Sequence, residues 1–287
     1  MIISGNSMNL DVRPSPIAGV WYEGDPKVLA RTVDAYLDGA QLPKLEGDVI
    51  GVVAPHAGHH YSGPVAGYAF AALRGRTPDL VAILSPFHDY QNAAFLTSGH
   101  EAYATPFGAV PIDDISVETL NTELESELGY GLTRITNDSE HSLEIELPFL
   151  QRTLGSEWKL LPVMVRTQEP SVSKTLGKAL AKTVQGRNAI LVASTDLSHY
   201  YDQQTALTLD SAMLAQIEAF SPEGAFDLDR SGKGYACGLG AMTAVMWAAR
   251  ELGADRVKVL QHATSGDITG DYDAVVGYGA AAILKTK

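Results

Sequence analysis

The alternation of short apolar runs with helical patterns limits the fold of this chain more than any other feature. Six runs have the length of strands, and several are apolar on both faces, which is typical of strands inside a sheet. The predicted strands are 48–55, 80–86, 158–165, 188–194, 256–262 and 273–284, and the predicted helices are 64–75, 116–126, 142–154, 171–184, 205–220 and 239–253. This order predicts an α/β fold in which helices cover both faces of a central sheet, an α/β/α sandwich.

Proline and turn patterns add detail to this prediction. Pro64 is expected in the first turn of the helix 64–75. Pro148 is expected to kink or end the helix 142–154. The segment 95–113 has the pattern of antiparallel strands joined by turns. The sheet is therefore expected to be mostly parallel but mixed.

Composition excludes several classes of function. The 287 residues carry a net charge of −13, and Lys and Arg are scattered, so a nucleic-acid-binding face is not expected. The sequence has no secretory signal pattern, no apolar run long enough to span a membrane and no internal repeat. We therefore expect a cytoplasmic protein without membrane or nucleic-acid partners, folded as one domain over residues 1–287.

Three predicted strands are followed by residues that can bind a metal or a proton. His56 and His88 follow the first two strands, and Asp196 and His199 follow the fourth. Because ligands of open α/β sheets bind beyond the carboxyl ends of the strands, we expect these side chains at one site. Local roles are the alternative, since His56 could stabilise a turn and Asp196 could cap a helix.

The single cysteine, Cys237, lies just before the predicted helix 239–253. One cysteine excludes an intramolecular disulfide and a Cys-rich zinc site. Backbone dipoles at a helix N-terminus favour a thiolate, although a lone cysteine is also common as a small buried hydrophobic residue. Imidazole, thiolate and carboxylate together suit iron, zinc or copper rather than magnesium or calcium.

Two more histidines, His59 and His60, follow His56 closely. One imidazole ligand at this position fits a metal site, whereas three ligands from one short loop are not expected. We therefore expect His59 and His60 to line the cleft or to lie on the surface.

The segment 137–150 is rich in acidic residues and contains His141. Glu140 and Glu144 are four residues apart, so on a helix they would share a face and could both point at the site. Their alternative role is to stabilise the N-terminus of that helix. His141 has no such structural role and is expected near the site.

Seven short motifs occur in the order seen in the Memo family, and the chain resembles that family nearly from end to end. The motifs are RPSPIAGVWYEGDP (13–26), APHAGHHYSG (54–63), SPFH (85–88), YATPFG (103–108), EHSLEIELPFLQ (140–151), STDLSHY (194–200) and ACG (236–238). In fold, Memo proteins resemble the catalytic subunit of LigB-type class III extradiol dioxygenases. The resemblance therefore implies a single LigB-like α/β domain with one cleft at the strand ends.

For the metal, the resemblance implies the ligands His56, His88 and Cys237. In the dioxygenases the metal is Fe(II), held by two histidines and a carboxylate, with open positions for substrate and oxygen. Here the thiolate of Cys237 would take the place of that carboxylate. The implied cofactor is therefore iron, with copper or zinc as the alternatives.

Four other motif residues take implied catalytic roles. Asp196 and His199 would orient the ligands or transfer protons, and Glu140 and His141 would line the same cleft. Relatives from bacteria and archaea are found beside AMMECR1-like and radical-SAM proteins, which implies a functional association with such partners.

These expectations lead to one favoured function and two alternatives. We expect a Memo-like, iron-dependent oxidoreductase that acts with O₂ on a small molecule or a peptide. The first alternative is a non-catalytic module that binds a peptide or protein, or handles metal, through a vestigial dioxygenase-like site. The second is a zinc-dependent hydrolase that uses the same ligands.

Overall fold

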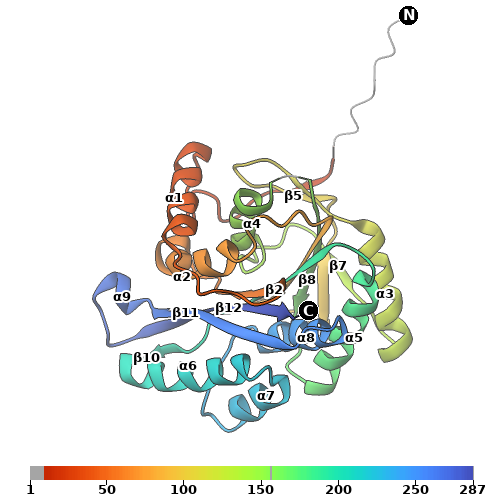
Figure 1. Cartoon of the computed structure of the whole chain (residues 1–287). Coiled ribbons are helices and arrows are strands. Elements are labelled where there is room, and N and C mark those ends of the chain that lie inside the picture. Colours follow the sequence, from red (N-terminus) through yellow and green to blue (C-terminus); the bar gives the residue numbers. More distant parts are fainter. Residues whose placement is uncertain (1–9, 156, 287) are drawn as a thin grey trace, which may run out of the picture.

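A nine-stranded mixed sheet runs through the centre of the protein (Figure 1). The computed structural model describes residues 10–155 and 157–286. Four neighbouring strands run parallel in the middle of the sheet: β2 (Asp48–Ala54), β9 (Ala189–Ser194), β3 (Leu80–Pro86) and β8 (Lys159–Val165). Antiparallel strands flank them, with β12 (Val275–Lys285) beside β2 and β4 (Phe95–Ser98) beside β8. The outer strands are β10 (His199–Tyr201) and β11 (Arg256–Thr264), which pair with β12, and β7 (Thr133–Ile135), which pairs with β4.

Helices cover both faces of this sheet (Figure 1). On one face lies α2 (His59–Ala71), with α1 (Pro26–Gly39) and α4 (Leu147–Leu154) packed on it. On the other lie α6 (Gln203–Glu218) and α8 (Leu239–Glu251), with α5 (Pro170–Val184) and α7 (Pro222–Arg230) packed on α8. The smaller elements are α3 (Asp114–Leu128), α9 (Gly266–Thr269), the 3-10 helix η1 (Glu144–Glu146) and a small sheet of β1 (Val12–Arg13), β5 (Ala102–Tyr103) and β6 (Val110–Pro111).

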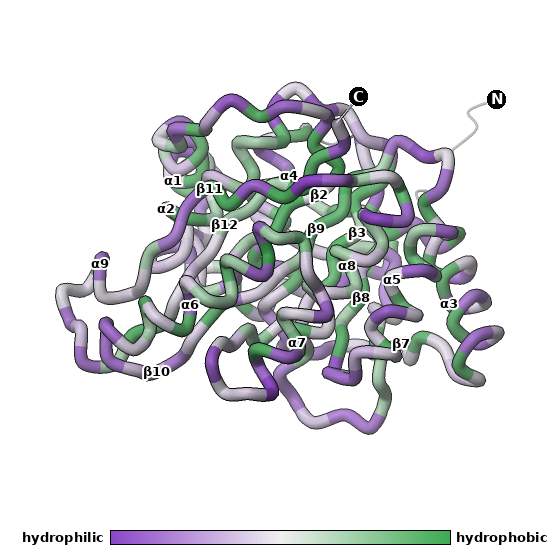
Figure 2. The backbone as a smooth tube through the Cα atoms, turned by 60° about the horizontal axis from the view of Figure 1, so that its bottom comes forward, coloured by the Kyte–Doolittle hydropathy of each residue, from purple (hydrophilic) through white to green (hydrophobic). Residues whose placement is uncertain are grey.

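The hydrophobic core lies between the central strands and the helices. Every residue of β3 is buried, and α8 is buried from Leu239 to Ala249, because both are covered on all sides. Figure 2 shows hydrophobic residues gathered in β9, β3, β8 and α8, and hydrophilic residues along the outer loops. Among the described residues, no helix is both long and apolar enough to cross a membrane.

The predicted fold class is confirmed, since the chain forms an α/β fold with a mixed sheet and helices on both faces. Parallel pairing is concentrated in the middle of the sheet, so the sheet is better described as mixed than as mostly parallel. The likeness to LigB-type dioxygenases stays a prediction. The extent of one domain over 1–287 also stays a prediction, because residues 1–9, 156 and 287 lie outside the described part.

Both expectations for prolines are wrong, one for a tertiary and one for a local reason. The helix α2 begins at His59, so Pro64 lies inside it rather than in its first turn. The amide of His59 donates to the carbonyl of Trp21 (2.8 Å), and this contact with the N-terminal segment supports the earlier start. Pro148 is the second residue of α4, where a missing amide hydrogen costs nothing, so it starts a helix instead of ending one.

The helix α1 was not predicted, although the sequence carries its signals. Asp25 accepts hydrogen bonds from the amides of the first turn, and Pro26 is the first helical residue. Leu29, Val33 and Leu37 recur every four residues and form its buried stripe. The helix α7 has a similar start, with Ser221 as its cap.

The carboxyl ends of β2, β9 and β3 lie side by side at one edge of the sheet. Ala54 pairs with Ser194, and Leu84 pairs with Ala193. The amide of Thr195 donates to the carbonyl of Ala54 (2.9 Å), which extends this pairing by one residue. The loops that follow these three strands therefore leave the sheet at nearly the same level.

Candidate metal centre

A cavity of about 620 Å³ opens beyond these three strand ends. Of the seven residues that the family resemblance implies as metal ligands or catalytic groups, six line it: His56, His88, His141, Asp196, His199 and Cys237. The exception is Glu140, which lies behind His88. This position agrees with the rule that ligands of α/β sheets bind beyond the carboxyl ends of the strands.

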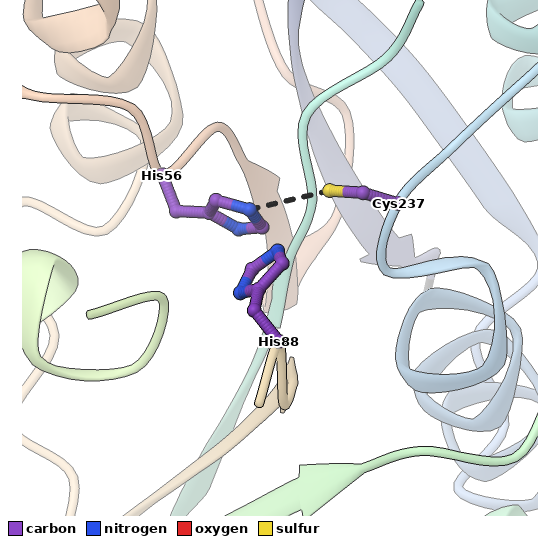
Figure 3. A group of neighbouring side chains, drawn as sticks. All are labelled: His56, His88 and Cys237. Carbon is purple, nitrogen blue, oxygen red and sulfur yellow. Dashed lines mark hydrogen bonds between the residues drawn. The ribbon is translucent and has the colours of Figure 1, made fainter. Parts of the chain in front are cut away.

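His56, His88 and Cys237 face one another in this cavity (Figure 3). Each offers one ligand atom, and these atoms all lie within 4.8 Å of one another. The Nε2 atom of His56 and the Sγ atom of Cys237 are 3.2 Å apart. Two nitrogen ligands and one sulfur ligand at this spacing fit a transition metal.

Ser194, the last residue of β9, fixes the tautomer of His56. Its hydroxyl donates to the carbonyl of Ser142 (2.7 Å), so its only hydrogen is used. The Oγ atom must then accept from Nδ1 of His56, which lies 2.9 Å away. With the proton on Nδ1, the lone pair on Nε2 points toward Cys237, as a metal ligand requires. Burial lowers the pKa of His56, which keeps the ring neutral.

Glu140 orients His88 in a similar way. Its carboxylate lies 3.0 Å from Nδ1 of His88 and accepts from the amides of His141 and Ser142 (2.9 Å each). Burial opposes the charge on Glu140, but the hydrogen bond from His88 and the nearby histidines hold its pKa well below the usual range. For His88, burial is likewise outweighed by Glu140, which raises its pKa. Carboxylate, histidine and metal in this order form a common arrangement in metal sites.

A second cluster of potential ligands consists of His88, Glu140 and His141, whose ligand atoms also lie within 4.8 Å of one another. Because Glu140 already accepts hydrogen bonds from the side chain of His88 and the amide of His141, these residues support His88 rather than forming a separate site.

Main-chain contacts hold Cys237 against the end of β9. Its amide lies 3.2 Å from the carbonyl oxygen of Asp196, and the amide of Asp196 donates to Sγ (3.2 Å). A Cβ atom on the next residue, Gly238, would lie 2.5 Å from the carbonyl oxygen of Ser194, so glycine permits this close approach. Burial, and then the charge of Asp196, raise the pKa of the Cys237 thiol. Burial therefore opposes the thiolate that the N-terminus of α8 favours.

Asp196 and His199 line the cavity beside these ligands. The carboxylate of Asp196 accepts the amide of His56 (2.8 Å), and burial raises its pKa to about 7. It can therefore exchange a proton near neutral pH. Nδ1 of His199 donates to the carbonyl of Leu197 (2.8 Å), which leaves Nε2 as the nitrogen that can accept a proton. Burial lowers the pKa of His199.

His141 is stacked between Trp21 and His88, with ring centroids 4.0 and 4.8 Å apart. Burial, together with the charge of His88, lowers the pKa of His141 to about 4, although Glu140 acts in the opposite direction. His141 is therefore a neutral imidazole at neutral pH and can accept a proton from a ligand in the cavity.

The turn that carries Glu140 is anchored by Arg13, which the sequence analysis did not single out. Arg13 is 1% exposed and forms ion pairs with Asp138 (2.7 Å) and Glu144 (2.6 Å). It also donates to the carbonyl of Glu140 (2.8 Å). A signal was present, since three acidic residues within seven positions require a cation from elsewhere when they are buried.

Glu144 and His59 point away from the cavity. Glu144 accepts from Arg13, Ser15 and Tyr22, because residues 140–143 are not helical and the expected shared face with Glu140 does not form. His59 is 3% exposed and lies 3.0 Å from the carbonyl of Ile145, so it is a core residue rather than a cleft or surface residue.

His60 behaves as expected and is exposed on α2.

Other residues near the site had no clear signal in the sequence. Glu146 is fully buried, and among the described residues neither of its oxygens has a hydrogen-bond partner; burial raises its pKa well above the usual range.

Aromatic side chains also line the cavity: Trp21, Tyr200, Tyr201 and Tyr235. Periodicity does not identify them, because they lie on loops and on the short strand β10.

The sequence of this chain matches a known protein family. Residues 13–282 match the family described as Memo-like protein. A MEMO1 family protein of Nitrosopumilus maritimus is 34% identical over 275 residues, which cover 94% of this chain and 98% of that protein. A MEMO1 family protein of Pyrobaculum aerophilum is 34% identical over 281 residues (94% and 98%), and one of Methanopyrus kandleri is 33% identical over 279 residues (93% and 97%). The chain therefore belongs to the Memo-like protein family.

Proposed function

We propose that this protein binds one iron ion through His56, His88 and Cys237. The convergence of these three side chains within 4.8 Å is the observation that supports the proposal most directly. Ser194 and Glu140 each occupy the Nδ1 atom of a histidine, so that the opposite nitrogen is available as a ligand. Copper and zinc suit the same donor set and are the alternatives.

When bound, iron would supply redox chemistry and an affinity for O₂. The residues of this chain would transfer protons and shape the cavity around the substrate. Asp196, with a pKa of about 7, and neutral His199 and His141 are placed to take a proton from a substrate or to return one. Trp21 and Tyr235 form apolar walls that limit the access of water to the site.

We infer from this that the protein is an oxidoreductase that uses O₂ to oxidise a small molecule in the cavity, in the cytoplasm of the cell. Three protein ligands leave positions open on an octahedral metal for a substrate and a second molecule. The likeness of Memo proteins to extradiol dioxygenases supports the same reaction class. The thiolate in place of a carboxylate makes the metal more electron-rich, so the reaction need not be ring cleavage.

Metal content and oxygen uptake test this proposal. Protein purified without oxygen and reconstituted with Fe(II) should hold about one iron per chain, whereas His88→Ala and Cys237→Ala should lose most of it. His60→Ala is the matched control, because His60 is exposed on α2 and should leave the iron unchanged. The iron-loaded protein should then consume O₂ with a substrate from a panel of phenols, thiols and short peptides.

Each other result has a defined meaning. No iron in the wild type after reconstitution would overturn the proposal. Tight iron or peptide binding without turnover would favour a non-catalytic binding or metal-handling module. Activity with Zn²⁺ in the absence of oxygen would favour a hydrolase, because zinc performs no redox chemistry.

A further inference from the structure

A second cavity of about 510 Å³ adjoins the cavity of the metal centre. The two cavities share four wall residues: Trp21, Ala57, Tyr200 and Val276. The second one extends from this shared wall over the N-terminus of α2 toward the segment between β11 and β12. The two cavities are therefore adjacent, and one elongated molecule that passes the shared wall would occupy both.

The lining of the second cavity is mainly apolar and aromatic. Val20 and Tyr61 form its outer part and are 78% and 42% exposed, and Tyr278 forms its buried floor. Exposed apolar residues that are gathered beside a polar site often mark a surface for a ligand.

The charged side chains in the walls of the two cavities indicate which charge the ligand can carry. Among the described residues that line either cavity, none is a lysine or an arginine. The acidic members are Asp196 in the first cavity and Asp271 in the second. A phosphate or carboxylate would therefore find no lysine or arginine in the second cavity, where His60 is the one imidazole among the described residues, and would be repelled by Asp271.

Tyr200 separates the two cavities and is 78% exposed. Its φ angle of 62° is in the left-handed region, and the pairing of β10 with β12 is irregular at this residue. A large side chain in this conformation is uncommon. The irregularity removes Tyr200 from the regular ladder and places it in the wall that the two cavities share.

We propose that the substrate of the metal centre is an elongated molecule with one polar, metal-binding end and an uncharged apolar or aromatic extension that lies in the second cavity. This inference rests on the proposed function, because the polar end is expected to bind the iron held by His56, His88 and Cys237. Specificity would come from the extension, since Val20, Tyr61 and Tyr278 contact that part of the molecule alone.

Hydroxamic acids with different tails test this inference on the iron-loaded full-length protein. The hydroxamate group chelates iron, so acetohydroxamic acid probes the metal and octanohydroxamic acid probes both cavities. Each fully buried methylene strengthens binding about fourfold, so the octyl compound should bind at least about tenfold tighter in calorimetric titration. Suberic acid monohydroxamate has a similar length but a carboxylate at its far end, and it should lose this gain.

Two tyrosines give a matched pair of variants. Tyr61→Ser should reduce the gain from the octyl tail to less than about threefold, because it removes apolar area from the second cavity. Tyr130→Ser should keep the full gain, since Tyr130 is also 42% exposed but lines neither cavity. Circular dichroism and iron content should be unchanged in both variants.

The outcomes separate this inference from the proposed function. Equal affinity for the acetyl and octyl compounds would overturn the elongated substrate and leave the iron site intact. A gain that survives in Tyr61→Ser and Val20→Ser would also overturn it, because the tail would then lie elsewhere. If neither compound binds although iron is loaded, the metal has no open position; the elongated substrate and the proposed oxidoreductase then both fail, while iron binding stands.

Discussion

Two clusters of buried polar side chains, one around Arg13 and one around His56, meet at the turn that carries Glu140. In the first, the guanidinium contacts Asp138, Glu144 and the carbonyl of Glu140, so that each buried charge has a partner within the chain. In the second, Sγ of Cys237 lies 3.2 Å from Nε2 of His56, and together with His88 they form a donor set that fits a transition metal. The polar groups around Arg13 are paired with one another, whereas the cluster around His56 also offers ligand atoms to a metal.

Removing Arg13 should have the largest effect, and it should act on stability. Arg13→Met leaves Asp138 and Glu144 buried without a cation, which should lower the free energy of unfolding by about 3–5 kcal/mol. Urea denaturation measures this loss. Arg152→Met is the control, because its ion pair with Asp34 is exposed and should contribute less than about 1 kcal/mol. Equal losses in both variants would show that the Arg13 cluster is not a structural anchor.

Changing Glu140 should act on the metal centre instead. Glu140→Gln keeps the size of the side chain but removes the charge that orients His88, so iron affinity should fall about 10–100-fold. Competition with a chelator of known affinity measures this change. Glu101→Gln, which alters an exposed glutamate that lines neither cavity, should leave the affinity unchanged. Unchanged affinity in Glu140→Gln would mean that His88 does not need this carboxylate.

Metal affinity should also depend on pH. Burial raises the pKa of Cys237, so the metal-free protein carries a thiol at neutral pH and must release its proton when metal binds. Affinity should therefore increase about tenfold per pH unit between about pH 7.5 and 9. Chelator competition at several pH values measures the slope, and Cys237→Ser should flatten it. A slope of zero in the wild type would remove Cys237 from the ligand set.

Glu146 should give the smallest effect. Its pKa is raised in the folded protein from an ordinary value of 4.5, so its contribution to stability is present below about pH 4.5 and is lost as pH rises toward the folded pKa. Glu146→Gln cannot ionise and should be more stable than the wild type by about 1 kcal/mol or more at pH 7.5. The two should be equally stable near pH 4.5, and Glu251→Gln, at the exposed end of α8, should match the wild type at both pH values. Thermal unfolding at each pH measures the difference.

The parts of the fold that local pattern controls could be predicted. Strands such as β3 are buried on both faces, so their apolar runs are visible in the sequence, and the ends of β2, β3 and β9 then place His56, His88 and Asp196 at one edge. The position of Cys237 is different, since it depends on how α8 packs against β9. Its ligand chemistry and its place before a helix made it a candidate, and the family resemblance grouped it with His56 and His88.

The remaining features depend on contacts between distant residues. Arg13 pairs with Asp138 across 125 positions, and no periodic pattern reports such a pair. The early start of α2 depends on the contact between His59 and Trp21. Glu140 was predicted to line the cleft, but it lies behind His88 because residues 140–143 form a turn and not a helix.

The close approach at Gly238 has a consequence for how this site can change during evolution. The main chain at Cys237 is held against the end of β9 by its amide, and a Cβ added at Gly238 would lie 2.5 Å from the Ser194 carbonyl oxygen, so main-chain contacts contribute to the position of residue 237. A codon change at that one position would exchange a soft ligand for a hard one without moving either helix or strand. If the proposed metal is bound there, its electronic character can change through this one side chain while the fold that positions the ligand stays the same.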